Sequence, residues 1–163
     1  MSLTLLFDLD DTLLDTNLEA FVPAYFQALG RHIENQVAPE VMLHALVRGM
    51  NLMNESEDPT RTLQDVFETE FYANLGIPKA DLLETLEDFY DYVFPLLKSH
   101  TQPRVDAVPL IEWAFSQGYR IAIATDPLFL RKATYHRLCW AGLDPERFEL
   151  VSTFENFHFT KTH

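Results

Sequence analysis

The sequence is poor in cysteine, in positive charge and in long apolar runs, and each shortage excludes a class of protein. Cys139 is the single cysteine, so no internal disulfide can form, which indicates a reducing compartment. No apolar run approaches the roughly 18 residues that are needed to span a membrane. Lys and Arg number 12 against 25 Asp and Glu, and the formal net charge of −13 argues against nucleic acid or an anionic membrane surface as a partner.

The length and the N-terminus indicate a globular protein of the cytoplasm. A chain of 163 residues can form one domain with a real core, or a small core that carries an insertion. Its apolar content of 47% is that of a globular protein. The N-terminus has no basic lead and reaches Asp8 too early for a secretory signal.

The first two thirds of the chain carry apolar residues at helical spacing. This spacing predicts helices at 18–30, 39–50, 63–75 and 78–97. Thr16 or Asn17 can cap the first helix, and Gly30 and Gly76 suit the ends of the first and the third. Successive amphipathic helices pack together, so residues 17–103 are expected to form a four-helix bundle.

The remaining segments alternate between strand and helix patterns. Residues 3–7 form a continuous apolar run, which predicts a strand that is buried on both faces and central in a parallel sheet. Further strands are expected at 119–124 and 148–152, and further helices at 106–117 and 128–141. Alternation of this kind is typical of parallel βαβ units with right-handed crossovers.

The predicted fold class is therefore α/β. A partial Rossmann-like core with a three-stranded parallel sheet is expected from residues 1–16 and 104–163, and the four-helix cap of residues 17–103 is inserted into it. Ligands of parallel sheets bind beyond the carboxyl ends of the strands. An insertion that leaves and re-enters at this edge can close over the site and exclude water.

Acidic residues directly follow the first expected strand. Asp8 and Asp10 lie two positions apart, so their carboxylates leave the end of an extended chain on the same side. Two carboxylates this close repel each other unless a cation or a shared proton lies between them. The pair predicts a hard divalent metal, Mg²⁺, with Asp8 and Asp10 as ligands. For a lone Asp, a turn or a helix cap would be the ordinary interpretation.

The whole string from Phe7 to Thr16, FDLDDTLLDT, resembles the first motif, Asp-x-Asp-x-Thr, of the haloacid dehalogenase-like (HAD) hydrolase superfamily. The resemblance implies that Asp8 is a nucleophile and that Asp10 is a general acid and base. An acid at Asp10 implies the phosphatase branch, because a halide leaves without a proton. Thr12 is implied to hold the loop and the geometry of Asp10, whose backbone carbonyl is an expected further metal ligand.

Two later positions match further motifs of the superfamily. Thr125 ends the second expected strand and matches a Ser or Thr whose hydroxyl binds the transferring phosphoryl group, and Asp126 is expected to add its backbone N–H. Lys161 follows the third strand and matches a Lys that offsets the repulsion between Asp8 and phosphate. The ordinary alternatives are a turn hydroxyl for Thr125 and a solvated side chain for Lys161.

The resemblance implies a Mg²⁺-dependent phosphatase that hydrolyses a small phosphomonoester through an aspartyl-phosphate. A phosphomutase of the same superfamily and a catalytically silent binding module remain alternatives. The fourth motif, an acidic pair that completes the Mg²⁺ shell, has no counterpart before His163, so we expect a truncated version of a longer enzyme. The first strand would then be an exposed edge, through which two chains could self-associate.

Overall fold

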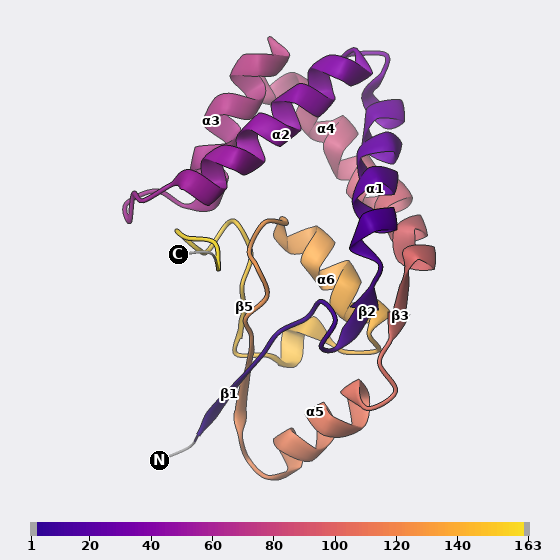
Figure 1. Cartoon of the computed structure of the whole chain (residues 1–163), viewed down its shortest axis with the longest axis vertical. Coiled ribbons are helices and arrows are strands. Elements are labelled where there is room, and N and C mark those ends of the chain that lie inside the picture. The colour runs from indigo at the N-terminus through magenta and orange to yellow at the C-terminus, as the bar shows by residue number, and fades with distance from the viewer. Residues whose placement is uncertain (1–2, 162–163) are drawn as a thin grey trace.

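The computed structural model describes residues 3–161 and has a helical part stacked on a smaller α/β part (Figure 1). The helical part comprises α1 (Leu18–Ile33), α2 (Pro39–Glu55), α3 (Leu63–Leu75), α4 (Lys79–Asp88), the π-helical turn η1 (Phe89–Val93) and the 3₁₀ helix η2 (Phe94–His100). The α/β part comprises β1 (Thr4–Phe7), α5 (Ala107–Ser116), β4 (Arg120–Ile123), α6 (Arg131–Trp140), the short 3₁₀ helix η3 (Pro145–Arg147) and β5 (Leu150–Val151). Across the described residues, no helix is long and apolar enough to cross a membrane.

The α/β part is built on a three-stranded parallel sheet in the order β1-β4-β5. Phe7 pairs with Ile123, and Ile123 pairs with Val151, so the three strands end at one edge. The predicted α/β class and the three-stranded parallel sheet are confirmed. β4 lies in the middle because its apolar run is buried, with Ile121, Ala122 and Ile123 inside the core.

The first strand is neither central nor buried on both faces in the described chain; it is an exposed edge, as the missing fourth motif led us to expect. β1 lies at the edge of the sheet, and Leu6 is 69% exposed, while Leu5 and Phe7 are partly buried against the core. Within residues 3–161 no strand pairs with its outer edge. An apolar run indicates that a strand can be buried, but which elements cover it depends on the tertiary structure.

Two of the three predicted helix ends are confirmed. Asn17 caps α1, accepting a hydrogen bond from the Ala20 N–H, and α3 ends at Gly76 in the left-handed region with φ of 68°. The predicted end at Gly30 is wrong because α1 continues to Ile33. There Gly30 is buried, and an added Cβ would lie 3.0 Å from the Met42 methyl carbon.

Two further predicted helices differ from the structure. The fourth pattern, expected to run to residue 97, is α-helical only to Asp88 and then widens into η1 and tightens into η2. The Phe94 N–H bonds the carbonyl of Phe89, five residues earlier, which is the π-helical pattern. The next residue, Pro95, has no N–H, so α-helical bonding cannot resume there. The helix predicted from residue 128 begins at Arg131, after a turn.

A short antiparallel pair that sequence analysis did not predict joins the two parts. β2 (Leu14–Thr16) pairs with β3 (Thr101–Pro103), with Thr16 opposite Thr101. The chain therefore enters and leaves the helical part at one place (Figure 1). A second connection is made where the Leu63 and Gln64 N–H groups at the start of α3 bond the carbonyls of Phe157 and Phe154.

Candidate active site

The chain turns sharply after β1, and the turn presents the acidic residues. The fully buried Leu9 accepts hydrogen bonds from the Leu13 and Leu14 N–H groups, both at 2.9 Å. Because side chains alternate along the chain, burial of Leu9 turns Asp8 and Asp10 away from the core. Asp11 adopts a positive φ of 55°, and its carboxylate accepts the Thr16 N–H at 3.2 Å, which closes the loop.

Asp8 contacts Lys161, a residue 153 positions away. The Lys161 ammonium Nζ lies 2.7 Å from Asp8 Oδ1, and the Lys161 backbone N–H donates to Asp126 Oδ1 at 3.2 Å. Three predicted residues, which follow β1, β4 and β5, thus meet at the carboxyl edge of the sheet. Asp126 was expected to supply its backbone N–H, whereas here its carboxylate holds the Lys161 backbone.

Thr12, which is predicted to hold the loop and the geometry of Asp10, contacts Asp8. Its hydroxyl lies 3.5 Å from Asp8 Oδ2, at the limit of a hydrogen bond. Thr125 is 2% exposed, and its hydroxyl has no partner among the described residues. Its carbonyl accepts the Ser152 hydroxyl at 2.6 Å, which ties the end of β4 to the residue that follows β5.

Asp10 forms an ion pair with Arg137 of α6, which sequence analysis did not identify. The Arg137 side chain is only 1% exposed, and Nη2 donates to Asp10 Oδ1. Its guanidinium carbon lies 4.7 Å from the centre of the Phe129 ring, close enough for a cation–π interaction. The Nε and Nη1 groups have no partner in the described part of the chain. Asp10 is therefore the counterion of a buried cation.

A signal for Arg137 exists in the sequence. In α6 the buried residues recur at helical spacing, at Ala133, Thr134, Arg137 and Leu138, so a guanidinium stands where the pattern requires a core residue. A charge at such a position is expected to be paired. The identity of its partner, 127 residues away, is visible only in the folded chain.

A cavity of about 410 Å³ lies between the helical part and the segment that follows β4. The α/β part contributes Asp10, residues 126–132 in part, Phe154 and Glu155 to its lining, and α1, α2, α3, α4 and Tyr90 of η1 contribute the rest. The hydroxyls of Tyr25 and Tyr90 meet in this lining at 2.8 Å. Burial raises the pKa of Tyr25 to about 12, although its hydrogen bond with Tyr90 lowers it, so both phenols are neutral over the ordinary pH range.

The donor set at the edge of the sheet fits Mg²⁺ in chemistry, although it is small. Mg²⁺ prefers oxygen ligands, commonly binds through one or two carboxylates and keeps several waters. Asp8 and Asp10 supply two carboxylates, and the Asp10 carbonyl is a possible third oxygen. Among residues 3–161 no group of three or more His, Cys, Asp or Glu side chains gathers to hold a metal. The residues present would therefore leave much of the metal's coordination to water and substrate.

Comparisons with known proteins found similar solved structures. No protein-family model and no curated protein matches it. A haloacid dehalogenase-like hydrolase from Bacteroides fragilis is 20% identical with a TM-score of 0.49, over 100% of this chain and 68% of that one. The L-2-haloacid dehalogenase of Xanthobacter autotrophicus is 15% identical with a TM-score of 0.46, over 100% and 61%.

A predicted phosphoglycolate phosphatase from Haemophilus somnus is 16% identical with a TM-score of 0.48, over 100% of this chain and 67% of that one. The chain thus spans 61 to 68% of the length of these three proteins. Their names include both a dehalogenase and a phosphatase. The chain is similar to these three proteins.

Proposed function

We propose that this chain carries the catalytic motif of a Mg²⁺-dependent phosphatase acting on a small phosphomonoester. The observation that carries the proposal is the meeting of Asp8, Asp126 and Lys161 at the carboxyl edge of the parallel sheet. Ligands of parallel α/β sheets bind at this edge. A nucleophilic carboxylate beside an ammonium group suits a dianionic substrate, since the cation offsets repulsion between the two anions.

In the first step, a carboxylate oxygen of Asp8 attacks phosphorus, and the bond from phosphorus to the alcohol oxygen breaks. This step requires the protonated form of Asp10, which gives its proton to that oxygen, so a neutral alcohol leaves. The ion pair with Arg137 is made by the ionised form of Asp10, which is the form that takes a proton in the second step. Arg137 occupies Oδ1 of Asp10, and Oδ2 has no partner within the described residues, which leaves this oxygen for proton transfer. The products of this step are an aspartyl-phosphate at Asp8 and an ionised Asp10.

In the second step, water attacks the phosphorus of the aspartyl-phosphate while Asp10 takes a proton from it. The phosphorus–oxygen bond to Asp8 breaks and inorganic phosphate is released, which restores both carboxyl groups to their starting states. Lys161 and the unpartnered hydroxyl of Thr125 are proposed to bind the phosphoryl oxygens. When bound at Asp8 and Asp10, Mg²⁺ would supply positive charge that stabilises the transferring group.

The helical residues 17–103 are proposed to act as the cap that selects the substrate, over a core made of residues 1–16 and 104–163. The exposed outer edge of β1 is a proposed surface for self-association, because unpaired backbone groups and an apolar face favour pairing with another strand.

The proposal is tested by release of inorganic phosphate from p-nitrophenyl phosphate, with Mg²⁺ and after its removal by chelation. We expect turnover that requires Mg²⁺ and that Asp8→Asn abolishes, because this variant removes the nucleophile at nearly constant volume. Asp15→Asn serves as the matched control, since Asp15 is exposed and lies outside the proposed machinery. Turnover by Asp8→Asn that equals the control would refute the mechanism. A phosphomutase would release phosphate poorly, and a silent module would release none.

A further inference from the structure

The cavity above Asp10 is walled by apolar side chains from all four α-helices of the helical part. Six of these side chains are Val22, Phe26, Met50, Phe67, Phe71 and Leu86. The rings of Phe67 and Phe71 stack at 4.8 Å, which forms an aromatic wall on α3. The volume, about 410 Å³, is within the range of sites that enclose a small organic ligand.

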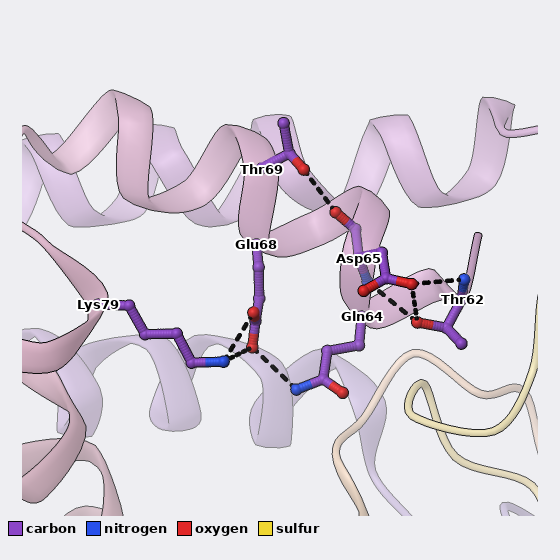
Figure 2. Close-up of polar contacts among 6 residues, drawn as sticks. All are labelled: Thr62, Gln64, Asp65, Glu68, Thr69 and Lys79. Atoms are coloured by element: carbon purple, nitrogen blue, oxygen red, sulfur yellow. Dashed lines mark hydrogen bonds and ion pairs between the residues drawn. The ribbon is translucent and has the colours of Figure 1, made fainter.

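Polar groups in the same lining are already bonded to each other. The Lys79 ammonium lies 2.7 Å from both carboxylate oxygens of Glu68, and the Gln64 amide donates to Glu68 at 2.8 Å. Figure 2 shows this network, in which α3 and the start of α4 satisfy each other's charges. The network leaves the Lys79 and Glu68 side chains without a demand for a ligand of opposite charge.

Polar groups on the side of the cavity formed by α6 are also bonded to protein partners. The Lys132 ammonium lies 2.5 Å from Glu87 Oε2 and 2.7 Å from Asp91 Oδ1, so it joins the α/β part to the helices. Glu155 accepts the Arg131 N–H at the start of α6 with both oxygens, at 2.7 and 3.0 Å. Most hydrogen-bonding groups of the lining are thus occupied by protein partners.

We propose that this cavity binds an apolar organic group, aromatic or branched aliphatic, of a phosphate monoester whose phosphoryl end lies at Asp8 and Asp10. This inference rests on the proposed phosphatase function, because Asp10, which lines the cavity, is the proposed acid that acts on the phosphate ester. An apolar group gains free energy when the walls remove it from water. The hydroxyls of a sugar would lose their hydrogen bonds to water and find few replacements.

Two esters with the same leaving-group chemistry separate these cases. Both 3-phenylpropyl phosphate and glycerol 1-phosphate release a primary alcohol, so a difference in kcat/KM reports recognition of the organic group. A single methylene in an apolar pocket is worth about 10- to 200-fold, so we expect the phenylpropyl ester to be preferred by at least about 100-fold. The corresponding phosphonates, which cannot be hydrolysed, provide a binding measurement by calorimetry.

Two substitutions on α2 form the matched pair. Met50→Trp adds bulk inside the cavity, whereas Val47→Trp adds it at a position that is 43% exposed and outside the lining. We expect Met50→Trp to weaken binding of the phenylpropyl phosphonate by at least about tenfold and Val47→Trp to leave it unchanged. Leu86→Phe, on the opposite wall, replaces Met50→Trp if circular dichroism shows that this variant does not fold.

The outcomes separate this inference from the proposed function. Equal kcat/KM for the two esters, or equal effects of Met50→Trp and Val47→Trp, overturns the apolar substrate class and leaves the phosphatase proposal standing. No phosphate release from either ester, with tight phenylpropyl phosphonate binding that only Met50→Trp weakens, supports the ligand class and refutes the phosphatase. Binding of the glycerol phosphonate as tight as that of the phenylpropyl phosphonate overturns the inference.

Discussion

Asp10 is predicted to be a structural residue as well as a chemical one, because it is the counterion of a buried cation. The Arg137 side chain is 1% exposed and that of Asp10 is 24% exposed. Asp10→Asn keeps the shape of the side chain and removes its charge, which leaves the guanidinium buried without an anion. Breaking a buried pair in this way costs about 3–5 kcal/mol. We expect the lower end, about 3 kcal/mol, since water reaches the exposed part of Asp10.

Asp8→Asn is the matched comparison, because Asp8 and Lys161 also form an ion pair. Their side chains are 39% and 45% exposed, so both charges remain hydrated when the pair is broken. An exposed pair contributes at most about 1 kcal/mol. The two substitutions make the same chemical change two residues apart, and we expect the free energy of unfolding to fall about three times as much at Asp10 as at Asp8.

The variants at Asp10 and Arg137 form a double-mutant cycle, and its second substitution removes the cation. Arg137→Met fills much of the same volume without a charge, so in the double variant with Asp10→Asn no ion is left buried. We expect the double variant to recover about 2 kcal/mol relative to Asp10→Asn alone. Urea denaturation followed by circular dichroism measures each free energy, with an unchanged slope as the check that the unfolding transition is comparable. Stability of Asp10→Asn within about 1 kcal/mol of the parent chain, or additive effects in the cycle, would refute the reasoning.

Three further predictions concern stability and association. Burial raises the pKa of Tyr25 to about 12, so its stabilising contribution is complete below the unfolded pKa near 10 and is lost as pH rises through 12. Burial also raises the pKa of Tyr90 well above its usual value, which acts in the same direction. The unfolding midpoint should therefore fall between pH 10 and about 12, and less steeply in the Tyr25→Phe/Tyr90→Phe variant. Thr62→Ala should lower the free energy of unfolding by about 1 kcal/mol in urea titrations, because it removes the reciprocal bonds with Asp65 that cap α3 (Figure 2); no loss would contradict the capping role. Leu6→Lys should reduce any self-association through β1 in sedimentation velocity, since a charge at this exposed edge opposes strand pairing; association at equal strength would assign it to another surface.

Local features of the fold could be predicted because their physical causes lie within a few residues. Asn17 caps α1 through a hydrogen bond three residues ahead, and Gly76 ends α3 because glycine accepts a positive φ. Gly30 has the same residue type but a different role, which is to let α1 pack against Met42. Strands β2 and β3, of three residues each, are too short to leave a periodic pattern, so their pairing could not be read from the sequence.

The candidate site, like the fold, could be predicted from the sequence only in part. The sequence alone determined the α/β class, the helical insertion and the positions of Asp8, Asp10, Thr125 and Lys161 at or after strand ends, because apolar periodicity and a compact motif are properties of neighbouring residues. Tertiary structure alone decided that Lys161 contacts Asp8 and that Arg137 is the cation of Asp10. Each of these depends on groups that are distant in sequence, and burial and pairing of charge are defined only once the chain has folded around them.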